Sequence, residues 1–203
     1  PMLGPAARKR IGPPLNARGR RMAARGISAD MVTLSGLAIG LLAAAIIAVG
    51  APYLALVPLL VSRLADGLDG AVARATQKTD FGGYLDITCD FLFYGAVPLG
   101  FVLMDPVANG VAGAFLLTSF YFNGTSFLGY AILAEKHDME TKRQGIKSLY
   151  YSNGLLEGTE TILFFVLICL LPSSFAVCAW IFGTLCFATA VLRLIGARRL
   201  FTK

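Results

Sequence analysis

The stretch from Asp66 to Asp90, DGLDGAVARATQKTDFGGYLDITCD, decides the fold because it joins two strongly apolar segments through a short polar turn. It holds four carboxylates, Asp66, Asp69, Asp86 and Asp90, at or inside the ends of these segments. The first pair is three residues apart and the second pair is four apart, so on a helix each pair lies on one face. Together the four charges would cost roughly 10 kcal/mol at membrane depth if nothing compensated them. We therefore expect cations to lie among them.

The same four carboxylates are candidates for a metal site. Carboxylate oxygens suit a hard divalent cation such as Mg²⁺ or Mn²⁺. Two such ions, roughly 3.5–4 Å apart, could clamp a pyrophosphate for an in-line displacement. A plainer interpretation is that these are turn carboxylates that pair with Arg74 and Lys78. That interpretation explains poorly why the helical spacing repeats on both sides of the turn.

Two small residues lie beside the first carboxylate pair. At about 100° per residue, Gly70 and Ala73 fall on the same helical stripe as Asp66 and Asp69. Because they have almost no side chain, another molecule could approach the backbone closely there.

The pattern as a whole resembles the signature of the CDP-alcohol phosphatidyltransferases, D-x2-D-G-x2-A-R-x8-G-x3-D-x3-D. Eight positions match it residue by residue: Asp66, Asp69, Gly70, Ala73, Arg74, Gly82, Asp86 and Asp90. The turn between Arg74 and Gly82 is one residue shorter than the usual pattern. Eight matched positions over two helices are a far stronger signal than a lone glycine motif.

The resemblance implies an enzyme that transfers a phosphatidyl group from a CDP-linked lipid such as CDP-diacylglycerol to an alcohol, with release of CMP. It implies a site that holds Mg²⁺ or Mn²⁺, with two ions expected, and a homodimeric assembly. The implied metal ligands are Asp66, Asp69, Asp86 and Asp90, and Asp90 is also the candidate base. The implied nucleotide-binding residues are Asp66, Gly70, Ala73, Arg74 and Thr33, the last being the one position kept from a Pro-Asn-x-x-Thr pattern of the family.

Composition places the chain in a membrane. It has 203 residues, of which 56% are hydrophobic and 15% charged, and its mean hydropathy is +0.68. A soluble domain could not hide that much apolar surface. We predict an all-α polytopic membrane protein in which six helices of about 20 residues each fit the ~30 Å apolar layer of a bilayer. The expected spans are residues 31–49, 53–75, 83–104, 111–133, 154–171 and 175–195.

The first 29 residues form a basic segment ahead of the membrane domain, which we assign to residues 30–203. They carry seven Arg and Lys residues and no acidic residue. Residues 15–25 could form a short helix on an anionic leaflet, although the charges could equally be a topology signal. At the entrance to the first span, Asp30 is expected to be the helix N-cap, the alternative being that it helps to hold the nucleotide.

Basic residues also predict the orientation. With both termini, the loop after the second span and the loop after the fourth span in the cytosol, the three opposite turns contain no Lys or Arg. This is a positive-inside pattern. It places the carboxylates on the cytosolic side of an inner or plasma membrane.

The acceptor alcohol is left open by the sequence. Lys142, Arg143 and Lys147 could bind an acceptor phosphate or could belong to a solvated loop. Glu157 and Glu160 could face the bundle cavity and bind a polyol or amino alcohol, or could be first-turn acids favoured by the helix dipole.

Two other functions fit the sequence less well than the transferase. A divalent-cation transporter would spread its acids through the midplane of symmetric halves, whereas here they cluster at one end and no internal repeat is visible. A catalytically silent scaffold is disfavoured by the intact motif. Within the enzyme interpretation, a soluble CDP-aminoalcohol that donates to diacylglycerol is the alternative. We expect membrane lipids as partners and no nucleic acid.

Overall fold

The computed structural model describes residues 5–137 and 158–201, and 92% of these residues are helical. Within this part of the chain there are no strands. The elements in chain order are α1 (Pro5–Ala24), α2 (Ala29–Ala48), α3 (Pro52–Ala75), α4 (Asp80–Met104), α5 (Pro106–Lys136), α6 (Gly158–Leu170), the 3₁₀ turn η2 (Pro172–Ser174) and α7 (Phe175–Phe201). The all-α prediction is therefore confirmed for the described residues.

Local sequence signals mark most of the helix boundaries. The Thr79 hydroxyl caps α4 by accepting from the backbone N–H of Gly82 at 3.0 Å, and Asp105 caps α5 in the same way. Proline occupies the start of α3, of α5 and of η2, where its missing N–H costs nothing. Gly50 turns the chain between α2 and α3 at φ +89°, a left-handed conformation that favours glycine.

Two details differ from the sequence prediction. The N-cap of α2 is Ser28, whose hydroxyl accepts from the Met31 N–H at 3.2 Å, so the assignment of the cap to Asp30 was wrong. Asp30 lies instead in the first turn of α2, where a negative charge suits the helix dipole. The basic helix α1 is longer than expected, because its helical backbone begins at Pro5 and continues through Pro13 and Pro14.

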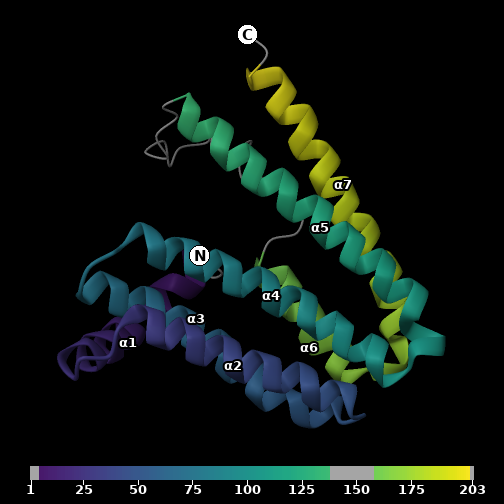
Figure 1. Cartoon of the computed structure of the whole chain (residues 1–203), viewed down its shortest axis with the longest axis horizontal. Helices are drawn as coiled ribbons and strands as arrows, with labels where there is room; N and C mark the ends of the chain where they lie inside the picture. Colours follow the sequence, from purple (N-terminus) through teal and green to yellow (C-terminus); the bar gives the residue numbers. More distant parts are fainter. Residues whose placement is uncertain (1–4, 138–157, 202–203) are drawn as a thin grey trace.

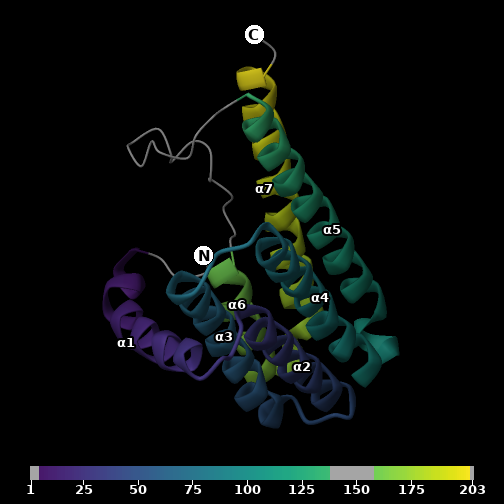
Figure 2. The ribbon, with the colours of Figure 1, turned by 60° about the vertical axis from the view of Figure 1, so that its left-hand side comes forward.

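The bundle has two parts that meet at α4. Helix α2 packs along both α3 and α4, while α5 packs along α7, and α4 also contacts α5. Figures 1 and 2 show α2, α3 and α4 side by side, with α1 across α3 and with α6 behind them. In both views α5 and α7 run in the same direction, and their carboxyl ends project beyond the other helices.

Aromatic side chains fill the core between these parts. Phe93 and Phe101 of α4, Phe165 of α6 and Phe175 of α7 are fully buried. The rings of Phe93 and Phe165 meet edge to face at 5.8 Å, and those of Phe101 and Phe175 stack at 4.8 Å. Such pairs contribute about 0.5–1.5 kcal/mol each beyond the area that they bury.

Small residues let α2 approach its neighbours closely. A Cβ atom at Gly100 of α4 would lie 2.6 Å from the carbonyl oxygen of Ala44 of α2. Across the other face of α2, the Ser62 hydroxyl of α3 donates to the carbonyl oxygen of Gly36 at 2.7 Å. Close backbone contact and interhelical hydrogen bonds are the usual means of helix association in membranes.

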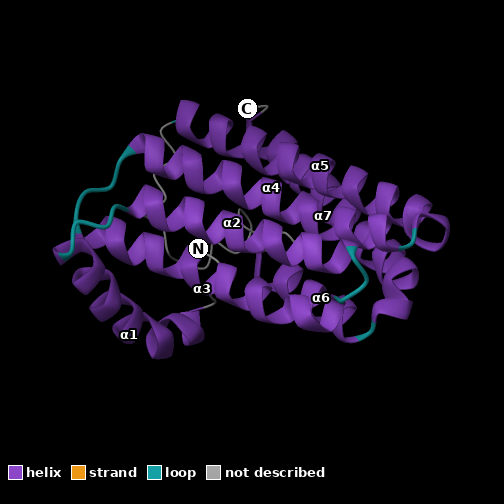
Figure 3. Cartoon of the chain, turned by 60° about the horizontal axis from the view of Figure 1, so that its bottom comes forward, coloured by secondary structure: helices purple, strands orange, loops and turns teal. Residues whose placement is uncertain are grey.

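Within residues 5–137 and 158–201, four helical stretches are long and apolar enough to cross a membrane: α2, α4, α5 and the stretch Pro172–Phe201 that contains α7. Helix α6 is apolar but has only 13 residues, and α3 carries charged residues in its second half. The chain is an integral membrane protein. The loops of the described part gather at two ends of the bundle, with α1–α2 and α3–α4 at one end and α2–α3, α4–α5 and α6–α7 at the other (Figure 3).

Candidate active site

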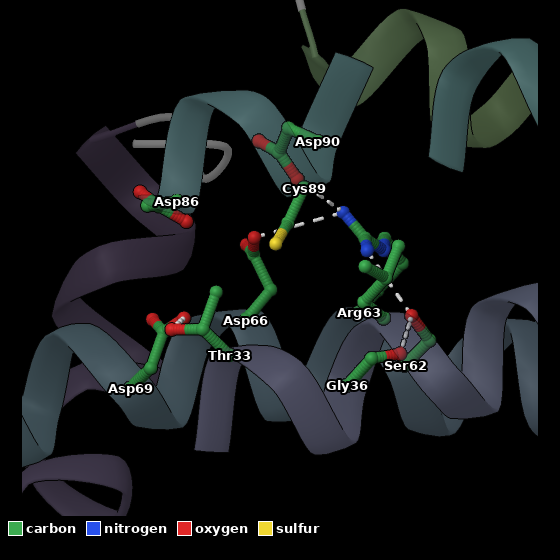
Figure 4. A pocket seen from close by; sticks show the side chains of 10 residues that line it. Thr33, Gly36, Ser62, Arg63, Asp66, Asp69, Asp86, Cys89 and Asp90 are labelled. Carbon is green, nitrogen blue, oxygen red and sulfur yellow. Dashed lines mark hydrogen bonds and ion pairs between the residues drawn. The ribbon is translucent and has the colours of Figure 1, made fainter. Parts of the chain in front are cut away.

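The predicted carboxylates come from two antiparallel helices joined by a short turn. Asp66 and Asp69 lie in the carboxyl-terminal half of α3, and Asp86 and Asp90 lie in the amino-terminal half of α4. Their helical spacing puts each pair on one face of its helix, and both faces line the same pocket. Figure 4 shows the four side chains converging on one pocket above α2 and α3.

Three of the carboxylates form a compact group. Asp66, Asp86 and Asp90 each place one oxygen within 4.8 Å of the oxygens of the other two. Their side chains are only partly exposed, with 17% of Asp66 and 23% of Asp90 accessible. Three hard oxygen donors at this separation are the kind of ligand set that Mg²⁺ and Mn²⁺ prefer.

The fourth carboxylate is held apart from this group. Asp69 is buried, and its Oδ2 atom accepts a hydrogen bond of 2.7 Å from the Thr33 hydroxyl of α2. Its Oδ1 atom accepts from the backbone N–H of Gly70. Figure 4 shows Asp69 beside Thr33, at the end of the pocket away from Arg63. Thr33 and Gly70 therefore position one of the predicted metal ligands.

Arg63 supplies one of the positive charges that the carboxylates require. Its Nη1 atom lies 2.9 Å from Oδ1 of Asp90 and 3.6 Å from Oδ1 of Asp66. Its guanidinium carbon lies 3.9 Å from the centroid of the Phe93 ring, a cation–π contact. The plainer pairing with Arg74 and Lys78 is not what the described residues show, since Arg74 donates to Oδ1 of Asn16 on α1 at 3.0 Å.

The sequence analysis did not single out Arg63, although a signal was present. It is an arginine inside an otherwise apolar segment, three residues before Asp66 and therefore on the same helical face. An isolated basic residue at membrane depth is rare and normally has an acidic partner. Ser62 and Cys89 were also missed. The described residues that line the pocket are Thr33, Gly36, Leu37, Ser62, Arg63, Asp66, Asp69, Asp86, Cys89 and Asp90.

The remaining predicted site residues lie elsewhere or outside the description. Ala73 is half-buried and Arg74 is exposed, both near the carboxyl end of α3. Glu160 is exposed in the first turn of α6 and is not among the residues that line the pocket. The other predicted acceptor residues, Lys142, Arg143, Lys147 and Glu157, lie outside the described residues.

The motif on α3 and α4 is part of a longer match to known proteins. A model of the CDP-alcohol phosphatidyltransferase family matches residues 27–196. The chain belongs to this family. It is a CDP-alcohol phosphatidyltransferase, and the transporter interpretation is set aside.

Relatives and a solved structure agree with this assignment. The chain is 50% identical over 192 residues to inner membrane protein YnjF of Escherichia coli, a match that covers 95% of this chain and 93% of that protein. It is 38% identical over 97 residues to archaetidylinositol phosphate synthase of Pyrococcus horikoshii, across 47% of this chain and 52% of the relative. The fold resembles that of Mycobacterium tuberculosis phosphatidylinositol phosphate synthase, solved with CDP-DAG bound, with a TM-score of 0.64 and 21% identity over 91% of this chain and 93% of that one.

Proposed function

We propose that this phosphatidyltransferase uses CDP-diacylglycerol as its donor and transfers the phosphatidyl group to the hydroxyl of an alcohol, releasing CMP. The observation that carries the proposal is the group of three carboxylates within 4.8 Å of one another, which the family motif places on α3 and α4. The fold shared with a synthase that was solved with CDP-DAG bound supports the choice of donor.

The residues present fit a divalent metal site. Asp66, Asp86 and Asp90 would offer hard oxygen ligands, and Asp69, which lines the same pocket, is proposed as the fourth ligand from the family motif. We propose Mg²⁺ or Mn²⁺, two ions in all. When bound, such ions neutralise pyrophosphate charge and stabilise the oxygens that are attacking and leaving.

Asp90 is proposed as the general base. Its Oδ1 atom is paired with Arg63, so the proton would go to Oδ2, which acts as the base when it faces the acceptor and is not fully coordinated by metal. The acceptor hydroxyl oxygen forms a bond to the β-phosphorus of the donor, the bond from that phosphorus to the CMP oxygen breaks, and the hydroxyl proton passes to Asp90. Such a reaction depends mainly on positioning and on charge neutralisation.

The nucleotide is proposed to lie along α3. Gly70 and Ala73, being small, would let the cytidine or its ribose approach the helix, and Arg74, whose Nη1 lies beside Gly70, would pair with a phosphate. Thr33 and Asp66 are assigned to the same subsite. Thr33 acts there through Asp69, whose orientation it fixes.

The proposal for the acceptor rests on predicted acceptor residues that are not among the described residues lining the pocket. Lys142, Arg143 and Lys147 suit an acceptor that carries a phosphate, whereas Glu157 and Glu160 suit a polyol or an amino alcohol. The names of the Pyrococcus relative and of the Mycobacterium structure make inositol phosphate the first acceptor to test.

We further propose a six-span topology with a basic interfacial segment at residues 1–29 and a membrane domain at residues 30–203. In this topology α3 and α6 also cross the bilayer, and both termini and the carboxylate site face the cytosol. The gathering of the α1–α2 and α3–α4 loops at one end of the bundle supports it (Figure 3).

Two further proposals concern location and assembly. The name of the Escherichia coli relative supports a location in the inner membrane. The family resemblance supports a homodimer.

The test is CMP release from CDP-diacylglycerol by the purified protein with Mg²⁺ or Mn²⁺, across a panel of phosphorylated and unphosphorylated alcohols. We expect release with one acceptor, a loss of at least 100-fold for Asp90→Asn, and little change for Asp80→Asn, which removes an exposed carboxylate from the same helix. If CDP-diacylglycerol is inert and CDP-choline donates to diacylglycerol instead, the donor assignment is wrong.

A further inference from the structure

Arg63 occupies a position inside the carboxylate site that neither the motif nor the proposed reaction explains. Its side chain is only 11% exposed. One nitrogen, Nη1, contacts two of the three grouped carboxylates, Asp66 and Asp90. Among the described residues that line the pocket, Arg63 is the only lysine or arginine.

The guanidinium is also anchored on its other side. Nη2 donates to the Ser62 hydroxyl at 3.1 Å, and that hydroxyl in turn donates to the carbonyl oxygen of Gly36. The guanidinium carbon lies over the fully buried Phe93 ring. Figure 4 shows Arg63 between the carboxylates and Ser62. A planar cation with several donors is suited to such a combined role, and a lysine is not.

The two carboxylate contacts of Arg63 are unequal. The 2.9 Å contact to Asp90 is a hydrogen-bonded ion pair, while the 3.6 Å contact to Asp66 is too long for a hydrogen bond. A metal ion that is coordinated by Asp66 would place a second positive charge beside Nη1. Because like charges repel strongly at such separations, the guanidinium would lose its longer contact, to Asp66, and keep the shorter one, to Asp90.

We propose that Arg63 is the resident cation of the carboxylate site and competes with divalent metal ions for Asp66. In the metal-free protein its single positive charge offsets part of the negative charge of Asp66 and Asp90. Metal binding breaks the contact to Asp66, while the ion pair to Asp90, the hydrogen bond to Ser62 and the cation–π contact with Phe93 remain. The inference rests on the proposed metal site, and it assigns to Arg63 the role of a positioning residue that sets metal affinity.

The consequence is that removal of Arg63 strengthens metal binding, the opposite of what loss of a purely structural residue does. Without the guanidinium, Asp66 is free to coordinate and the net charge of the site is more negative. We expect Arg63→Gln to tighten Mn²⁺ binding by about tenfold or more, since charges a few ångströms apart at the protein–water boundary interact strongly. Arg63→Lys keeps the positive charge. We therefore expect its dissociation constant for Mn²⁺ to lie closer to the wild-type value than to the value of Arg63→Gln.

The experiment is a titration of the purified full chain in detergent with Mn²⁺ alone, followed by electron paramagnetic resonance of the free ion. The proteins are the wild type, Arg63→Gln, Arg63→Lys and Lys78→Gln. Lys78 is exposed just beyond α3, so its replacement removes one positive charge outside the pocket and is the matched control. The unfolding temperature of each protein is measured with and without Mn²⁺.

Tighter Mn²⁺ binding by Arg63→Gln than by Lys78→Gln, together with a larger rise in unfolding temperature on adding Mn²⁺, supports the inference. If the wild type binds Mn²⁺ saturably and no more weakly than Arg63→Gln does, the inference about Arg63 is overturned and the proposed function stands. If Arg63→Gln lowers the unfolding temperature equally with and without Mn²⁺, Arg63 is only a structural residue. If none of the four proteins binds Mn²⁺ saturably, the metal site itself is wrong, and the proposed function fails with it.

Discussion

The hydrogen bond from Thr33 to Asp69 joins two helices at the edge of the site, and its removal gives a sharp prediction. The donor and acceptor oxygens are 2.7 Å apart, both residues are buried, and 36 residues separate them in the chain. A hydrogen bond to a charged group contributes about 1.5–3 kcal/mol. Thr33→Val removes the hydroxyl at nearly constant volume. For a chain of this length a loss near 2 kcal/mol lowers the unfolding temperature by about 4–8 °C.

The assay is thermal unfolding of the purified protein in detergent, combined with CMP release at increasing CDP-diacylglycerol. We expect Thr33→Val to lower both stability and transfer, and Thr33→Ser, which keeps the hydroxyl, to restore most of each. Thr118→Val is the matched control, because its exposed hydroxyl donates only to a carbonyl of its own helix, α5. A Thr33→Val protein that unfolds within about 1 °C of the wild type would refute the reasoning.

Three further predictions concern helix contacts and metal binding. Gly100→Ala pushes a methyl group against a carbonyl oxygen of α2 and should cost about 1–3 kcal/mol, whereas Gly110→Ala, which meets nothing within 4 Å, should be neutral or stabilising; unfolding temperatures distinguish the two. Gly19→Ala brings a Cβ atom 2.7 Å from the backbone of α3 and should loosen α1, so trypsin should cut faster at Arg25 than in the control Gly12→Ala, which has open space. Chelation with EDTA should lower the unfolding temperature, and Mn²⁺ at 100 times its dissociation constant should restore about 2.7 kcal/mol.

Much of the fold could be predicted because turn-forming and capping residues stand at several of the helix ends. Gly50 and Pro52 separate α2 from α3, Asp105 and Pro106 separate α4 from α5, and Pro172 precedes α7. Between these marks the apolar runs are long, so the existence of each helix follows from length and composition. The start of α1 was harder to predict. Two adjacent prolines, Pro13 and Pro14, normally interrupt a helix, whereas here the helical backbone continues through them.

The sequence predicted the aspartates of the site but not the arginine, Arg63, that pairs with two of them. The spacing of Asp66, Asp86 and Asp90 is visible in the sequence, because helical periodicity relates neighbours on one helix. The pairing of Arg63 with Asp90 spans 27 residues and two helices, and no periodicity reports on a contact between helices. Likewise, the sequence shows that Thr33 is kept from a family pattern, but only the packing of α2 on α3 shows that it holds Asp69.

The position of the pocket along the chain has a consequence for how the protein is made. All the described residues that line it lie between Thr33 and Asp90, so a ribosome has synthesised them before it begins α5. Chains that grow from the amino terminus can fold in that order, and contacts between consecutive helices form fastest. The helices that follow would then close over a site in which Asp66 and Asp90 already share the charge of Arg63 and Asp69 already accepts from Thr33, so these three carboxylates are not exposed to lipid without partners during insertion.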